Sequence, residues 1–128
     1  MITGGCLCGA VRYKADAYEK DYRICHCTAC RKQSGHFWSA TEVPLAAFRL
    51  TEERGLKWFK SSDFATRGFC GDCGSSLFYR LNDGDTIEVA PGSMDGRTGL
   101  RLTGHIFVAD KGDYYDLNDG LPQWDASS

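Results

Sequence analysis

The seven cysteines of this 128-residue chain fall into three close clusters, and their spacing suits thiolates that bind a metal ion. The clusters are Cys6-x-Cys8, Cys25-x-Cys27-x-x-Cys30 (the triplet) and Cys70-x-x-Cys73. Two pairs and a triplet divide into a four-thiolate site, which closes a tetrahedral zinc ion, and a three-thiolate site, which leaves one coordination position open. An open position is where zinc can act on a substrate.

Strand geometry groups the closely spaced cysteines. Successive side chains of a strand point to opposite faces, so Cys6 and Cys8 should share one face, and so should Cys25 and Cys27. His26 lies between the last two and should face away from the metal. We therefore do not expect His26 to be a ligand.

The segment Cys70-Gly-Asp-Cys73-Gly has the composition of a zinc knuckle, because its glycines allow the tight turn around both sulfurs. Such a pair needs a second pair, and Cys6 with Cys8 is the obvious donor. We predict a structural zinc at these four cysteines, of the kind that contributes ~10–16 kcal/mol of apparent binding free energy. The sequence leaves open whether the triplet shares a ligand with another cluster.

The triplet predicts an exchangeable zinc. Three thiolates make zinc a weak Lewis acid, so capture of a soft thiol substrate is favoured over generation of hydroxide. The alternative is a second structural zinc completed by His36, His105 or a carboxylate. Arg31 and Lys32 follow directly and could bind an acidic substrate, although they could equally be solvated surface charges. The sequence assigns no other catalytic residue.

The segments that carry these cysteines are predominantly β-strands. Expected strands cover 10–14, 22–27, 36–43, 56–60, 76–81, 86–89 and 105–109, with another around Phe69. Short helical turns are expected at 28–32, where Thr28 could be the cap, and at 44–48 after Pro44. The sequence therefore predicts an all-β fold with one or two helical turns.

Length and composition favour one zinc-binding domain over residues 1–128. Hydrophobic residues make up 42% and charged residues 25%, as in soluble domains, and no signal peptide or membrane span is evident. An odd number of closely spaced cysteines argues against disulfides, so we expect a reducing, cytoplasmic location. The net charge of −2 does not favour nucleic acid as a partner.

The sequence segments around the cysteines are similar to those of a known family. They are Gly-Gly-Cys-Leu-Cys-Gly-Ala-Val-Arg-Tyr (4–13), Cys-His-Cys-Thr-Ala-Cys-Arg-Lys-Gln-Ser-Gly (25–35), Arg-Gly-Phe-Cys-Gly-Asp-Cys-Gly-Ser-Ser-Leu (67–77), His-Ile-Phe-Val-Ala-Asp-Lys (105–111) and the ending 115–124. The chain resembles the glutathione-dependent formaldehyde-activating enzyme family, which also includes centromere protein V.

The resemblance implies a β-tent fold of small antiparallel sheets around zinc. It also implies a structural ion at Cys6, Cys8, Cys70 and Cys73 and a functional ion at Cys25, Cys27 and Cys30. The implied reaction joins glutathione and formaldehyde to S-hydroxymethylglutathione, which in reverse is that of a carbon–sulfur lyase. We therefore expect an enzyme that uses glutathione or a similar thiol.

Two other functions stay open. One is a non-catalytic zinc module that binds a protein or nucleic acid, which the resemblance to centromere protein V allows. The other is redox chemistry or iron binding at the Cys-x-x-Cys pairs, which the absence of a thioredoxin-like βαβ pattern disfavours.

Overall fold

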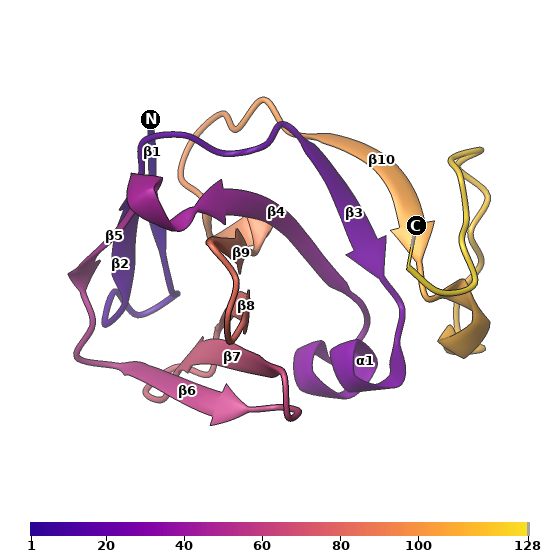
Figure 1. Ribbon diagram of the computed structural model, residues 1–128, viewed down its shortest axis with the longest axis horizontal. Coiled ribbons are helices and arrows are strands. Elements are labelled where there is room, and N and C mark those ends of the chain that lie inside the picture. Colours follow the sequence, from indigo (N-terminus) through magenta and orange to yellow (C-terminus); the bar gives the residue numbers. More distant parts are fainter. Residues whose placement is uncertain (128) are drawn as a thin grey trace.

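The backbone of residues 1–127, which the computed structural model describes, forms ten strands in two sheets (Figure 1). The smaller sheet has the order β1-β2-β5, with β1 (Ile2–Gly5), β2 (Arg12–Ala15) and β5 (Phe48–Glu52). The larger sheet has the order β10-β3-β4-β9-β8-β7-β6, with β10 (Arg101–Ile106), β3 (Asp21–Cys25), β4 (Trp38–Pro44), β9 (Thr86–Val89), β8 (Ser76–Leu81), β7 (Ala65–Cys70) and β6 (Leu56–Lys60). The prediction of an all-β fold is confirmed.

One strand pair is parallel, and it lies beside the triplet. β10 runs parallel to β3, which places Ile106 opposite Cys25, whereas the other strand pairs in the described residues are antiparallel. On its other side, Cys25 pairs with Trp38 of β4. The end of β3 is thus held between two neighbours, which fixes the start of the triplet.

Several strand boundaries agree with the sequence, and others do not. β6, β8 and β9 have the predicted bounds, whereas β10 begins at Arg101 and ends at Ile106 rather than covering 105–109. β1 and β5 were not predicted. β1 ends in two glycines, which are poor strand formers, so its signal is weak. β5 (Phe-Arg-Leu-Thr-Glu) does alternate apolar and polar residues, a short strand signal that the prediction missed.

The one α-helix of the described residues, α1 (Thr28–Ser34), is capped by Cys27 rather than by Thr28 as predicted. The Cys27 sulfur accepts a hydrogen bond from the Cys30 backbone N–H at 3.3 Å, and Gly35 ends the helix at φ 90°. Three 3₁₀ turns also occur: η1 (Leu45–Ala47), η2 (Pro91–Ser93) and η3 (Val108–Asp110). None of the helices within residues 1–127 has the length and apolar character needed to cross a bilayer.

The main core joins the two sheets. Buried side chains from β1, β2, β4, β8 and β9 pack together with Cys6 and Cys70. Tyr13 lies near the centre, 1% exposed, with its ring 5.5 Å from that of Phe78 and its hydroxyl 2.6 Å from the Ser93 hydroxyl. A smaller buried cluster of Cys30, Trp38 and Ala40 packs against the rest of the triplet.

Replacing Tyr13 separates the contribution of its ring from that of its hydroxyl. Tyr13→Ala should lower the free energy of unfolding by ~3–5 kcal/mol through a core cavity. Tyr13→Phe should cost only ~0.5–1.5 kcal/mol, because the Ser93 hydroxyl keeps its hydrogen bond to the Ala90 carbonyl. Urea unfolding at equal metal content measures both, and equal losses would contradict this assignment of the core.

Candidate metal centres and the adjoining cavity

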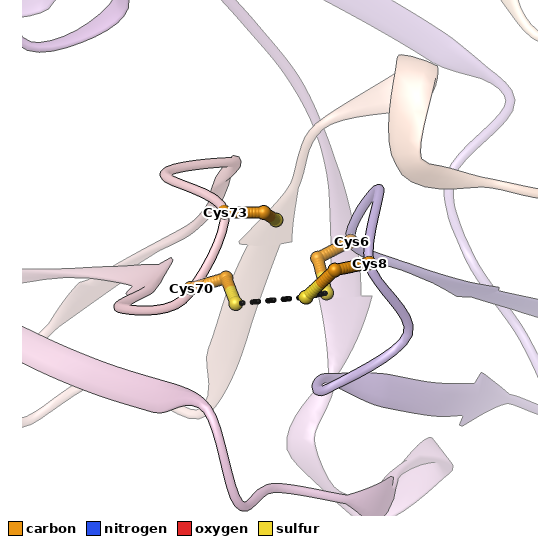
Figure 2. A group of neighbouring side chains, drawn as sticks. All are labelled: Cys6, Cys8, Cys70 and Cys73. Carbon is orange, nitrogen blue, oxygen red and sulfur yellow. Dashed lines mark hydrogen bonds between the residues drawn. The ribbon is translucent and has the colours of Figure 1, made fainter.

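Four cysteines from distant parts of the chain converge in the four-cysteine cluster (Figure 2). Cys6 and Cys8 lie after β1, Cys70 ends β7, and Cys73 lies in the turn to β8. The Cys8 sulfur is 3.7 Å from the sulfurs of Cys6 and Cys70, and all four sulfurs lie within 4.8 Å of one another. Tetrahedral zinc with Zn–S bonds of ~2.3 Å separates its sulfurs by ~3.8 Å, so the cluster fits one zinc ion.

Local hydrogen bonds orient the sulfurs of this cluster. The Val11 backbone N–H donates to the Cys6 sulfur at 3.2 Å. The Ser75 side chain and backbone hydrogen-bond to Cys73 and lower its pKa to about 5, which favours the thiolate that binds metal. Gly74 has φ 81°, the left-handed conformation that lets the chain turn back directly after Cys73.

The triplet forms a separate group at the junction of β3 and α1. Its three sulfurs lie within 4.8 Å of one another, and no His, Asp or Glu of the described chain joins them at that distance. Hydrogen bonds from Cys25 and Cys30 lower the pKa of Cys27 to about 2. The structure therefore brings together both predicted cysteine sets, and each could hold a metal ion.

The three histidines lie outside both cysteine clusters. His26 is fully buried and faces away from the triplet into a polar chain: its Nδ1 hydrogen-bonds to the Tyr115 hydroxyl, and its Nε2 lies 2.9 Å from Nδ1 of His105. The His105 Nε2 lies 2.7 Å from an Asp119 oxygen. His36 is exposed and packs on aromatic rings. The sequence suggested the orientation of His26 but gave no sign of its partners, which are 79 or more residues away.

Arg67 is a buried cation beside the triplet that the sequence analysis did not single out. It lies on β7 and is 5% exposed, and its Nη2 donates to the Cys30 sulfur at 3.5 Å. Its guanidinium also lies over the Tyr79 ring, 4.9 Å from the centroid. Within residues 1–127, Nε and Nη1 have no hydrogen-bond partner. A buried positive charge is costly alone, so Arg67 fits best beside sulfur ligands that are negatively charged.

Arg31 and Lys32, the predicted substrate-binding residues, lie in the last turn of α1. Arg31 is half-buried and Lys32 is exposed, and neither lines the cavity at the triplet. Their contact with a substrate stays a prediction.

A cavity of about 320 Å³ opens at the triplet. All three cysteines line it, together with Arg67 and a mainly apolar wall that includes Trp38, Phe64, Ile106 and Phe107. Phe107 is the one residue other than glycine in residues 1–127 with positive φ, at 56°, a conformation that costs energy and is often found at functional sites. The triplet is therefore accessible from a shaped, largely apolar space.

Glu88 of β9 lies where this cavity meets a second, more polar cavity of about 380 Å³. Burial, together with the nearby charge of Glu42, raises the pKa of Glu88 to about 7, and Arg67 partly opposes this shift. Glu88 can therefore hold or release a proton near neutral pH. Its position inside a strand gave no signal in the sequence.

The raised pKa predicts how stability depends on pH. The folded protein holds the Glu88 proton more tightly than the unfolded chain, whose ordinary value is 4.5. The contribution of Glu88 to the free energy of unfolding is therefore complete below that value and is lost as pH rises through about 7. Relative to Glu88→Gln, the free energy of unfolding of wild type should fall by ~1–3 kcal/mol between pH ~5 and ~8. Urea unfolding across this range tests the sign, and Glu42→Gln should move the loss to lower pH. Parallel curves for wild type and Glu88→Gln would refute it.

The chain is similar to known proteins over most of its length. The family model for the glutathione-dependent formaldehyde-activating enzyme matches residues 1–110. An uncharacterized lyase of Schizosaccharomyces pombe is 30% identical over 121 residues, which cover 89% of this chain and 83% of the yeast protein. A crystal structure of a Rhodobacter sphaeroides protein has the same fold, with a TM-score of 0.65 and 21% identity over 95% of this chain and 98% of the other. The chain therefore belongs to the glutathione-dependent formaldehyde-activating enzyme family.

Proposed function

We propose that the protein is a zinc-dependent carbon–sulfur lyase-type enzyme that acts on adducts of glutathione or a similar thiol. In the opposite direction, it would join the thiol to an aldehyde, as in S-hydroxymethylglutathione formation. Membership of the family and the lyase relative support this activity. The observation that carries the proposal is the triplet, whose three sulfurs converge on one point and face a cavity.

In this proposal, Cys25, Cys27 and Cys30 hold a zinc ion, and Cys6, Cys8, Cys70 and Cys73 hold a structural one. Zinc at the triplet would supply a fourth position for the substrate thiol and favour its thiolate form. A reducing, cytoplasmic setting would keep all seven thiols available.

The protein's own groups would prepare this site. Arg67 offsets the negative charge of the sulfurs and holds Cys30 through its hydrogen bond. The Cys30 backbone N–H fixes the Cys27 sulfur. Arg31 and Lys32, outside the cavity, are the proposed contacts for the carboxylates of a glutathione-type thiol.

Metal content should separate the two cysteine sets. Cys70→Ser should lower the melting temperature by more than ~10 °C, because the four-cysteine cluster joins segments 62 or more residues apart. Cys27→Ser should bind one zinc fewer than wild type and lose less stability, because its cluster spans only one turn. Elemental analysis and thermal unfolding provide the measurements. Wild-type zinc content in Cys27→Ser would remove the triplet from metal binding.

Activity should depend on the triplet. Cys27→Ser should lower glutathione-dependent aldehyde consumption by ~100-fold or more, since even residues that only support metal ligands commonly contribute 10–100-fold. Thr28→Ala is the matched control, because Thr28 is an exposed neighbour outside the cavity, and it should keep wild-type activity.

The non-catalytic alternative makes a different spectroscopic prediction. In the cobalt-substituted protein, glutathione should change the absorption spectrum if a thiol reaches the triplet. An unchanged spectrum, together with wild-type turnover in Cys27→Ser, would contradict the proposed function.

A further inference from the structure

The cavity at the triplet is much larger than formaldehyde. Its volume is about 320 Å³, which lies at the lower end of the range for small-molecule sites, ~300–1,000 Å³. Formaldehyde has only two heavy atoms and fills about the space of two water molecules, each ~30 Å³ in the liquid. Even with the sulfur end of a thiol beside the triplet, formaldehyde would leave much of this space without a ligand.

The chemistry of the wall also disfavours the charged body of glutathione in this space. That tripeptide carries two carboxylates and an ammonium group, whereas the wall beside the sulfurs consists largely of Trp38, Phe64, Ile106 and Phe107. The one cation in the wall, Arg67, contacts Cys30 and Tyr79, and its two nitrogens without a partner within residues 1–127 could meet one carboxylate of glutathione but not both. Desolvating charged groups against such a surface is unfavourable.

One aromatic residue at this cavity is still exposed to water. Phe64, in the loop between β6 and β7, lines the cavity although 64% of its surface is accessible. An apolar group that enters the cavity would cover part of this ring and gain from the loss of exposed apolar surface. Phe64 therefore favours a ligand with an apolar substituent.

We propose that this cavity binds the carbonyl partner of the reaction and that the partner is an aldehyde with an apolar, aryl- or alkyl-sized substituent, with Glu88 as the group that exchanges a proton with its oxygen. This inference rests on the proposed function and names its second substrate. The substituent would lie against Phe64, Phe107 and Trp38, with the carbonyl carbon toward the triplet.

The bond changes are balanced without an oxidant or reductant. The substrate thiolate gives an electron pair to the carbonyl carbon, so a carbon–sulfur bond forms and the carbon–oxygen π bond breaks. The oxygen takes the proton of the Glu88 carboxyl group, which the proton lost by the thiol later restores. Cleavage of the adduct runs these steps in reverse, with Glu88 accepting the hydroxyl proton.

The surroundings of Glu88 suit this exchange. Glu42 from β4 favours the protonated carboxyl group, whereas Arg67 from β7 favours the carboxylate that remains after the proton has left. Burial, and after it the nearby charge of Glu88, raises the pKa of the Tyr79 hydroxyl group from β8. Glu88 also faces both cavities, so it lies between the apolar space and the polar one.

Substrate preference tests the proposal in the zinc-loaded full chain. With glutathione as the thiol, we compare the rate enhancement, which is kcat/KM divided by the uncatalysed second-order rate constant for the same aldehyde. This enhancement should be at least ~10-fold higher for 4-fluorobenzaldehyde than for formaldehyde. Phe64→Ala should lower this ratio by ~10-fold. The matched control is Phe59→Ala, which removes an equally exposed ring, 60% accessible on β6 and outside the cavity, and should keep the ratio.

A binding measurement gives a readout independent of turnover. The unreactive analogue 4-fluorobenzyl alcohol should show saturable ¹⁹F line broadening with wild type and with Phe59→Ala, and weaker broadening with Phe64→Ala.

For the proton step, Glu88→Gln should lower kcat by ~100-fold or more at pH ~6, while the kcat of Glu42→Gln should stay within a few-fold of wild type.

The outcomes separate the two proposals. Turnover of formaldehyde with no preference for the fluorinated aldehyde and no binding of the alcohol would overturn this inference and leave the proposed function standing. Failure to consume either aldehyde would overturn the proposed function and this inference with it. Undiminished kcat in Glu88→Gln would remove Glu88 from the step.

Discussion

Convergence of four thiols from segments far apart in the sequence is the constraint on which the structure depends. Cys6 and Cys8 follow the first strand of the small sheet, and Cys70 and Cys73 belong to the β7–β8 turn of the large sheet. Four thiolates at tetrahedral spacing in a partly buried cluster repel one another when no cation is bound. A metal ion bound to all four would remove this repulsion and link the two sheets. The same cluster adjoins the main core through Cys6 and Cys70, so core packing and an ion bound there would support each other.

Such a cross-link would also stabilise the triplet, because β7 connects the two clusters. Cys70 ends that strand, and Arg67 lies three residues earlier with its guanidinium on Cys30. Fixing the end of β7 therefore fixes the cation that balances the second group of sulfurs. A guanidinium suits this position better than an ammonium group would, since its planar fork can donate to sulfur while its face lies over Tyr79. The two clusters are separate sites, but a single strand holds both in place.

Features that depend on local spacing could be predicted from the sequence, and features that depend on contacts between distant residues could not. Both cysteine sets followed from spacing because metal ligands within a loop must lie two or three residues apart. Arg67, Glu88 and the His26–His105 pair carried no such signal, because each gains its role from residues on other strands. Capping of α1 by Cys27 instead of Thr28 was also not predicted, because the same sulfur belongs to the triplet and accepts the capping hydrogen bond.

Position relative to the core explains why two similar sets of thiols can differ in function. The four-cysteine cluster supplies a full set of ligands against the main core, so an ion there has no place for a substrate. The triplet supplies three sulfurs from one turn, packs on a small buried cluster, and borders a cavity whose other wall comes from β7, β8, β9 and the end of β10. Those strands contribute Arg67, Glu88 and Ile106, while Trp38 of β4 and Phe64 of the β6–β7 loop complete the apolar surface. The junction of β3 and α1 thus carries the three sulfurs, while the surrounding strands shape the cavity that they face.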